Sequence, residues 1–156
     1  MEAARFAVAD DVGVIVALTE ELRAELTPMR GGAVWSQREA RFAPDAAAFE
    51  ALIGRDDVCV VAGTIEGAVV GFGVCVVEPL HDGEDLGVID ELYVTPDARG
   101  VGVGEQVLAA MVTWCRERGC VGIDALALPG HRAAKNFFEG AGLTARALVM
   151  HRSLRE

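Results

Sequence analysis

One stretch of this chain decides its fold: Tyr93-Val94-Thr95-Pro96-Asp97-Ala98-Arg99-Gly100-Val101-Gly102-Val103-Gly104-Glu105. It leaves an apolar, strand-like run, passes through a loop, and enters an amphipathic helix predicted over residues 103–118. Three glycines in five residues let the backbone approach a ligand closely. The first turn of the helix offers unpaired N–H groups and the positive end of the helix dipole. Together these features predict an anion site that suits a phosphate.

Three kinds of phosphate-binding loop compete for this glycine pattern. A Walker loop requires Gly-Lys-Ser/Thr, which is absent. A dinucleotide fingerprint requires GxGxxG, but the third glycine falls one place early, and the acid 20 residues after Gly104, Asp124, sits inside a predicted strand. The pattern R-x-x-G-x-G is met by Arg99, Gly102 and Gly104, and Arg99 adds a positive charge at the loop entrance.

Hydrophobic periodicity around this loop predicts elements in the order β-α-α-β-β-β-α-β-α-β. The predicted strands and helices are strands at 4–9, 58–64, 68–77, 86–94, 121–127 and 143–154, and helices at about 11–23, 45–54, 103–118 and 132–139. Residues 33–44 are expected to be irregular or partly helical. Asp10 or Asp11 is expected to cap the first helix, and Pro44-Asp45 to open the second.

These elements predict an α/β (α+β) fold with a mixed central sheet. Glu66-Gly67 is a turn signal between two β-branched runs, which predicts an antiparallel hairpin. Strands 86–94 and 121–127 are joined through a helix and should therefore be parallel. We expect helices on both faces of the sheet and a single domain over residues 1–156.

Charge is distributed unevenly along the chain. The sequence has 24 acidic and 14 basic side chains, a net charge of −10. Residues 1–97 hold a net −13 and residues 98–156 a net +3. The acidity argues against a nucleic-acid partner, because neutralising phosphates needs clustered Lys and Arg. A nucleotide held by backbone N–H groups is not excluded.

Cysteine usage and hydropathy bear on the compartment. The N-terminal residues lack the apolar region of a secretory signal, and the longest apolar run, 68–77, is too short to span a bilayer. Cys59, Cys75, Cys115 and Cys120 form no CxxC pair and no Cys/His metal spacing. We therefore expect a cytoplasmic protein with free thiols, no metal and no membrane partner. The alternative is a disulfide bond between Cys115 and Cys120.

The loop with Arg99, Gly102 and Gly104 resembles the coenzyme A pyrophosphate loop of the GNAT acetyltransferase superfamily. Residues 91–96 resemble the family's central strand and its Pro-containing exit, and residues 131–143 resemble its second cofactor segment. The element order matches the family's over nearly the whole chain. The resemblance implies an N-acetyltransferase that moves an acetyl group from acetyl-CoA to a primary amine of a small molecule or peptide. It also implies that strands 86–94 and 121–127 splay apart.

The resemblance assigns three groups of cofactor contacts and no metal. Loop amides hold the pyrophosphate, the central strand pairs with the pantetheine arm, and the thioester lies near Leu92. His131 stands where the family often has Asn, and Phe138 where it often has a Tyr general acid. The implied cofactor-binding residues are Leu92, Tyr93, Val94, Arg99, Gly100, Val101, Gly102, Val103, Gly104, Glu105, His131, Asn136 and Phe138.

The implied chemistry is direct attack of the amine on the thioester carbonyl, assisted by a base. Glu91 is the first candidate base and Asp90 the second. Neighbouring strand residues point to opposite faces, so only one of them is expected to face the cleft, where it acts as the base or only binds an ammonium. His81 is a further candidate base. Because Phe138 has no proton to donate, Tyr93 is the only phenolic candidate acid.

Two other functions compete with an enzyme. Phe138 at the acid position favours a non-catalytic coenzyme A-binding or sensor domain, and the glycine loop leaves a nicotinamide-binding protein as a weaker rival. Trp35 lies in the segment that lines the acceptor pocket of such folds. The acidity of residues 1–97 indicates a cationic amine acceptor. The apolar run 143–150 is expected to serve a homodimer, a state common in the family.

Overall fold

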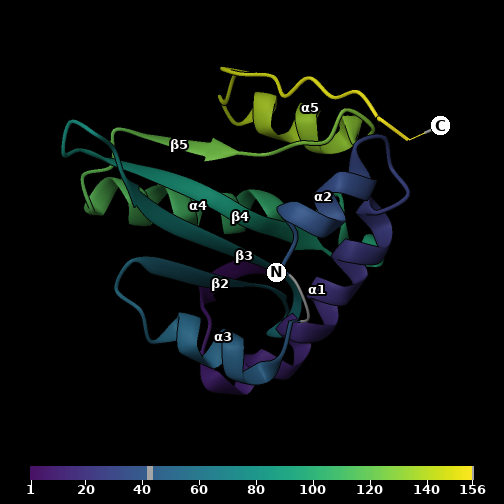
Figure 1. Ribbon diagram of the computed structural model, residues 1–156. Helices are drawn as coiled ribbons and strands as arrows, with labels where there is room; N and C mark the ends of the chain where they lie inside the picture. The colour runs from purple at the N-terminus through teal and green to yellow at the C-terminus, as the bar shows by residue number, and fades with distance from the viewer. Residues whose placement is uncertain (42–43, 156) are drawn as a thin grey trace.

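The computed structural model describes residues 1–41 and 44–155, in which five strands form one sheet in the order β1-β2-β3-β4-β5 (Figure 1). The strands are β1 (Glu2–Phe6), β2 (Val58–Ile65), β3 (Ala68–Pro79), β4 (Asp85–Val94) and β5 (Gly122–Ala125). β1 to β4 pair antiparallel, whereas β4 and β5 pair parallel. The predicted mixed sheet is confirmed.

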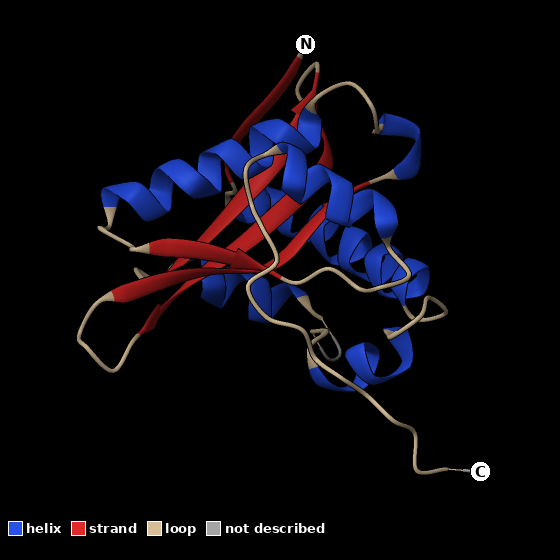
Figure 2. Cartoon of the chain, turned by 90° about the horizontal axis from the view of Figure 1, so that it is seen from above, coloured by secondary structure: helices blue, strands red, loops and turns tan. Residues whose placement is uncertain are grey.

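Helices cover both faces of this sheet, as predicted (Figures 1 and 2). The helices are α1 (Val12–Leu26), α2 (Gly32–Arg38), α3 (Ala46–Ile53), α4 (Val103–Glu117) and α5 (Arg132–Gly140), with 3-10 turns at Ala9–Asp11 and Pro96–Ala98. α1 and α3 pack on one face, and α4 on the other. The parallel pairing of β4 with β5 follows from α4, which connects them.

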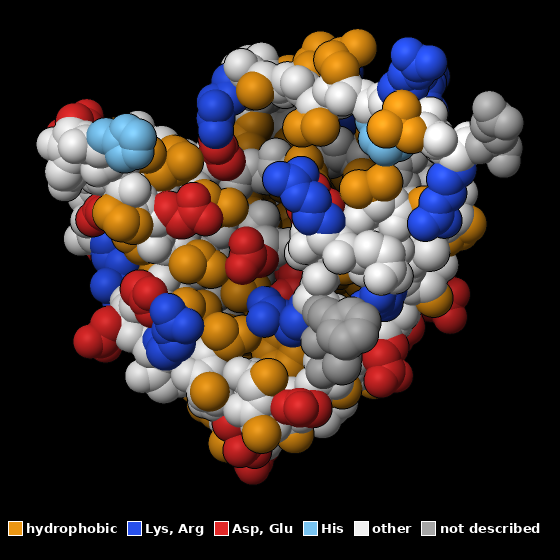
Figure 3. All heavy atoms as spheres, in the orientation of Figure 1, with side chains coloured by type: hydrophobic (Ala, Val, Ile, Leu, Met, Phe, Trp, Pro, Cys, Tyr) orange, Lys and Arg blue, Asp and Glu red, His pale blue; other side chains and the backbone are white. Residues whose placement is uncertain are grey.

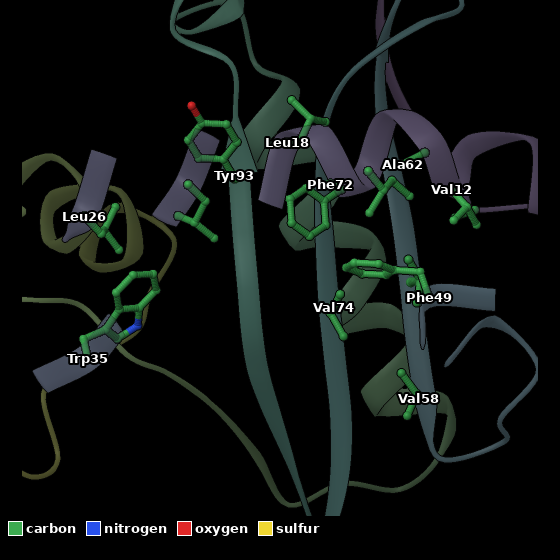
Figure 4. Close-up of a cluster of buried hydrophobic side chains, with 14 of the residues drawn as sticks. Val12, Leu18, Leu26, Trp35, Phe49, Val58, Ala62, Phe72, Val74 and Tyr93 are labelled. Atoms are coloured by element: carbon green, nitrogen blue, oxygen red, sulfur yellow. The ribbon is translucent and has the colours of Figure 1, made fainter. Parts of the chain in front are cut away.

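β2 is buried on both faces, so its alternate residues enter two different cores. Val58, Val60 and Ala62 enter the core beneath α1 and α3, whereas Cys59 and Val61 enter the core beneath α4. Figure 4 shows the first core, where Phe49 of α3 lies beside Phe72 of β3. Their ring centroids are 6.3 Å apart in an edge-to-face arrangement.

The hairpin between β2 and β3 turns at Glu66 and Gly67, as predicted. Both residues have positive φ, 47° and 82°, which a two-residue hairpin turn needs to match the twist of its strands. Ile65 and Ala68 pair on either side of the turn.

α4 lies close enough to the sheet that two strand positions have no room for a side chain. A Cβ on Gly63 would lie 2.7 Å from Val103, and one on Gly73 would lie 2.7 Å from Val107. Glycine weakens a strand, but here it permits the close approach of the helix. This contact fixes the N-terminus of α4, and with it the loop that follows β4.

The expected capping of the first helix by Asp10 or Asp11 does not form. α1 begins at Val12, and no side chain caps it. The Asp11 carboxylate instead accepts hydrogen bonds from the Arg5 guanidinium at 2.7 and 2.9 Å and from the Val8 N–H at 2.8 Å. The guanidinium lowers the pKa of Asp11, so a charged partner from β1 outcompetes the helix end for this carboxylate.

The segment between α1 and β2 follows the prediction more closely. The Asp45 carboxylate caps α3 by accepting from the Ala48 N–H at 2.8 Å. Residues 32–38 form α2, so the segment 33–44 is partly helical as expected. Positions 42 and 43 of that segment lie outside the described residues.

The strand expected at 143–154 is wrong: residues 143–155 have no regular secondary structure and form no ladder with the outer edge of β5. The segment runs along α5 (yellow in Figure 1), and the Arg146 side chain pairs with Asp124 of β5. A strand needs backbone bonds to a neighbouring edge, so β-propensity alone did not suffice. The apolar side chains left 79% to 87% exposed are Leu148, Val149, Met150 and Leu154.

Candidate functional site

β4 and β5 separate part-way along β4. Their pairing runs from Leu86 opposite Gly122 to Ile89 opposite Ala125, whereas β4 stays paired with β3 as far as Val94. The splay expected between these strands is therefore present. Beyond Ile89 the β5-facing edge of β4 has no strand partner among the described residues. Backbone groups on such an edge can pair with an extended ligand.

A β-bulge at Asp90 marks the point of separation. Val74 of β3 lies opposite Glu91, and the next residue, Cys75, lies opposite Ile89, so Asp90 is the extra residue. The bulge interrupts the strict alternation of the strand. Asp90 and Glu91 are both among the residues that line one cavity, and the Arg41 guanidinium acts on both carboxyls.

The glycine loop (residues 99–104) borders a cavity of about 230 Å³, here named the loop cavity. Gly102 has a φ of 100° and precedes α4, whose first amides are capped by no side chain. The loop cavity thus has the free N–H groups and positive helix end of an anion site. The predicted cofactor residues that line it are Leu92, Tyr93, Val94, Arg99, Gly100, Gly102, Val103, Gly104, Glu105, His131 and Phe138. The exposed Val101 and Asn136 do not line it.

Arg99 ties the glycine loop to the end of β4. Its Nε donates to the Val94 carbonyl at 2.8 Å, and its Nη2 donates to the Glu25 carboxylate of α1 at 3.0 Å. The guanidinium also lies 5.3 Å from the centroid of the Tyr93 ring. Arg99 is therefore held in place, and Glu25, which the sequence analysis did not identify, offsets part of its charge.

A second cavity, of about 300 Å³ and here named the acid cavity, adjoins the loop cavity. Four carboxylate residues line it: Glu39, Asp90, Glu91 and Asp124. Trp35 of α2 and Leu26 of α1, neighbours in Figure 4, belong to its apolar wall. The residues shared by both cavities are Leu22, Leu92, His131, Ala134 and Phe138. An anion-binding end and an acidic end therefore meet beside Leu92.

Glu91 is the most buried carboxylate of the acid cavity, with 6% of its surface exposed. Arg41 donates to its Oε1 from Nε at 2.8 Å and from Nη2 at 2.6 Å. Its Oε2 is buried without a hydrogen-bond partner in the described part of the chain. Burial raises the pKa of Glu91, and Arg41 opposes the rise by favouring the ionised form. Glu91 thus combines a fixed orientation with one unused oxygen.

Burial also raises the pKa of Asp90, with Arg41 opposing and Glu78 reinforcing the rise. The carboxyl is less enclosed than that of Glu91, because Asp90 is exposed at the bulge. Both candidate bases therefore hold a proton more tightly than an ordinary carboxylate.

The other candidate residues have separate surroundings. The Tyr93 hydroxyl donates to Glu21 of α1 at 3.2 Å, and burial raises its pKa to about 12. In Figure 4 that hydroxyl points away from Trp35. His131 borders both cavities, and burial lowers its pKa. His81 is exposed between β3 and β4 and lines neither cavity.

Replacing Arg41 with methionine is expected to destabilise the fold by about 3 kcal/mol, because it leaves the Glu91 carboxylate buried without its cation. The measurement is the urea midpoint at neutral pH. Arg38→Met is the matched control, since Arg38 pairs with Glu39 at the surface and such pairs contribute less than about 1 kcal/mol. Equal midpoints for the two variants would show that the Arg41–Glu91 pair is energetically unimportant.

Within residues 1–41 and 44–155, no group of three or more His, Cys, Asp or Glu side chains is placed to hold a metal ion. No helix in that part of the chain is long and apolar enough to cross a membrane.

Comparison with known families decides the relationship of the chain. The model of the acetyltransferase (GNAT) family matches residues 16–143. The chain belongs to the GNAT acetyltransferase family. The match includes β4, the glycine loop and α5, so the resemblance seen in the sequence is confirmed. Members of the GNAT family generally use acetyl-CoA as co-substrate.

Solved structures share this GNAT fold at low sequence identity. A tetramutant of the BH1408 protein from Bacillus halodurans has a TM-score of 0.80 and 18% identity, over 97% of this chain and 99% of that one. An aminoglycoside acetyltransferase from an uncultured soil metagenomic sample, in complex with sisomicin, has a TM-score of 0.73 and 17% identity, over 99% of this chain and 96% of that one. Ribosomal-protein-alanine N-acetyltransferase from Brucella melitensis has a TM-score of 0.71 and 17% identity, over 98% of this chain and 100% of that one. No match was found among curated protein sequences.

Proposed function

We propose that this GNAT chain is an N-acetyltransferase that moves the acetyl group of acetyl-CoA to a primary amine. The observation that carries the proposal is the meeting of the loop cavity and the acid cavity beside Leu92, where the edge of β4 is unpaired. The structural neighbours include an aminoglycoside acetyltransferase and a ribosomal-protein-alanine N-acetyltransferase, which supports small-molecule or peptide amines as acceptors.

The loop cavity suits acetyl-CoA because it joins an anion site to a free strand edge. The amides at the start of α4 would hold the pyrophosphate, and Arg99 would add charge beside it. The free edge of β4 would pair with the amides of the pantetheine arm, which brings the thioester to Leu92. Val101 and Asn136 lie outside the cavity and are left out of the proposed contacts.

The proposal gives the base role to Glu91. Its free Oε2 would accept the amine proton while Arg41 holds the other oxygen. The pKa raised by burial makes the carboxylate a stronger base, nearer to the operating pH. Asp90 is the second candidate because the bulge places it on the same cavity. A role limited to binding the substrate ammonium is the alternative for either residue.

No side-chain acid is proposed for the leaving thiolate. Phe138 borders both cavities but cannot donate a proton, and the Tyr93 hydroxyl is bound to Glu21. Phe138→Tyr is expected to fold normally and to raise kcat two- to tenfold, below the roughly 100-fold of an optimised acid. Phe137→Tyr is the matched control, since Phe137 lines only the loop cavity. A kcat for Phe138→Tyr at or below the wild-type value would contradict this expectation.

The acid cavity favours a cationic acceptor. Four carboxylate residues line it, of which Glu91, Glu39 and Asp124 are paired with Arg41, Arg38 and Arg146. Asp90 has no ion pair in the described part of the chain and is the carboxylate left for a cation. The test is coenzyme A release from acetyl-CoA with amines of similar size that carry an additional positive, neutral or negative group. We expect kcat/KM to be highest for the amines with an additional positive charge. A preference for the negatively charged amines would contradict the assignment.

Turnover, coenzyme A binding and thermal stabilisation together separate the rival functions. Tight coenzyme A binding with no turnover over the whole panel would favour a binding or sensor domain. Thermal stabilisation by NAD, with none by coenzyme A, would favour a nicotinamide-binding protein. A cytoplasmic location stays part of the proposal, and the four free thiols support it.

We also propose that the chain forms a homodimer through the apolar side chains of residues 148–154. Hydrophobic side chains remain at the surface along the upper edge of Figure 3, where α5 and this segment lie in Figure 1. Light scattering should give the mass of two 16.5 kDa chains for the wild type and of one for Leu148→Glu/Met150→Glu. Val14→Glu, at an exposed position of α1, is the control and should stay dimeric. A monomeric wild type would overturn this assignment.

A further inference from the structure

All four cysteines gather on the α4 face of the sheet, and none of them lines the loop cavity or the acid cavity. Cys59 and Cys75 lie opposite each other on β2 and β3. Cys115 lies near the end of α4 and Cys120 just beyond it, both in contact with the same core. The sulfur atoms of Cys75 and Cys115 are 3.5 Å apart. The proposed reaction uses none of these thiols.

The end of α4 brings Cys115 and Cys120 together. The Cys120 N–H donates to the Cys115 carbonyl at 3.0 Å, and the Gly119 N–H donates to the Arg116 carbonyl at 3.0 Å. Gly119 has a φ of 73°. These bonds make a Schellman motif, in which the side chains at the positions of Cys115 and Cys120 contact each other. The motif usually joins two apolar side chains, but here it joins two thiols.

The two thiols differ in pKa and in exposure. Hydrogen bonds from Cys75 and Cys120, together with the Arg118 guanidinium, lower the pKa of Cys115 to about 7 against the opposing effect of burial. Arg118 is held 4.4 Å from the centroid of the Trp114 ring. Cys115 is only 4% exposed, whereas Cys120 is half-buried and open to a small solute. A thiol with a lowered pKa thus lies directly behind a reachable thiol.

We propose that Cys115 and Cys120 are a redox-active pair that a peroxide converts into an intramolecular disulfide. The Cys120 sulfur attacks an oxygen of hydrogen peroxide, the O–O bond breaks, and a sulfenic acid and one water form. The Cys115 thiolate then attacks the Cys120 sulfur and expels hydroxide, which takes the proton that Cys115 had released and becomes the second water. The two thiols lose two electrons and two protons, and the peroxide is reduced to two waters.

The relative rates of the two steps follow from the surroundings. Burial and the neighbouring Cys115 raise the pKa of Cys120, so little of its thiolate is present and its oxidation is slow. The second step is fast, because the attacking Cys115 is adjacent and its pKa is lowered. No sulfenic acid should therefore accumulate in the wild type.

The test treats the full chain with hydrogen peroxide, counts free thiols and maps cross-links by mass spectrometry of an unreduced tryptic digest. Arg116 and Arg118 lie between the two cysteines, so trypsin separates them unless a disulfide joins them. The wild type should lose two thiols, gain a Cys115–Cys120 cross-link, and recover both thiols with dithiothreitol. Cys59→Ala is the matched control and should behave identically, because burial raises the pKa of Cys59 to about 12.

Cys120→Ser removes the reachable thiol at a half-buried position and should fold normally. It should keep all three remaining thiols under the same treatment. Three results would each overturn the proposal: a Cys75–Cys115 cross-link, a cross-link between two chains, or four surviving thiols in excess peroxide.

Discussion

Replacing Gly102 with glutamate is expected to weaken the binding of acetyl-CoA at least 100-fold, about 2.7 kcal/mol. Gly102 has a φ of 100°, where an L side chain is strained, and a Cβ there would lie 3.4 Å from Glu2. The added Cβ faces Glu2, which does not line the loop cavity, so the new side chain strains the glycine loop and places a second negative charge at its edge. Backbone strain and like-charge repulsion therefore act together against the anionic cofactor. Titration calorimetry with acetyl-CoA measures the loss.

Two further variants show whether the lost binding reflects the phosphate site. Gly13→Glu adds the same side chain at an open position of α1 and should bind acetyl-CoA as the wild type does. Gly102→Ala shares the backbone strain without the charge and should lose less than tenfold in affinity. Thermal melts confirm that each variant is folded. Unchanged affinity in folded Gly102→Glu would remove the glycine loop from the cofactor site.

Replacing Glu91 with glutamine is expected to lower kcat by about 100- to 1,000-fold while leaving the affinity for acetyl-CoA unchanged. The glutamine keeps the size of the side chain but cannot take a proton from the amine. Glu91 lines the acid cavity and not the loop cavity, so cofactor binding should not depend on it. Steady-state kinetics at saturating acceptor and calorimetry with acetyl-CoA give the two quantities.

Asp90→Asn is the matched comparison, because Asp90 lies on the same cavity but is exposed at the bulge. Its kcat should fall by less than tenfold. A wild-type kcat in Glu91→Gln combined with a large loss in Asp90→Asn would transfer the base role to Asp90.

The pH profile provides an independent check on the base. A carboxylate accepts a proton only when it is ionised, so activity should rise with pH through the titration of Glu91. Burial raises that pKa, which places the rise above the ordinary range of a glutamate. Arg41→Met removes the group that opposes the shift, so the rise should move to still higher pH. A profile that is unchanged in Glu91→Gln would assign the rise to another group.

The parts of this fold that sequence predicted well are those with local causes. The Glu66-Gly67 turn carries its own backbone requirement, and the apolar stripe of α4 marks the face that packs on the sheet. The glycine loop lies between the two elements that define it. These signals extend over a few residues each, so no tertiary information was needed to locate the glycine loop.

Other features depend on contacts between distant parts of the chain. Arg41 pairs with Glu91 across 50 positions, and nothing in its own segment marks it as a partner. The bulge at Asp90 exists only in the pairing of β3 with β4, so alternation along one strand could not reveal it. The segment 143–154 has the composition of a strand, but its backbone does not pair with the outer edge of β5 and contacts that strand through the Arg146 side chain.

The most direct test of the proposed function is mass spectrometry of the product. The wild-type chain is mixed with acetyl-CoA labelled with carbon-13 in the acetyl group and with the amine that the panel ranks first. We predict that the amine gains one labelled acetyl group on nitrogen for each coenzyme A thiol released, and that Gly102→Glu forms no such product. Coenzyme A bound tightly by the wild type, without labelled product from any amine of the panel, would contradict an N-acetyltransferase.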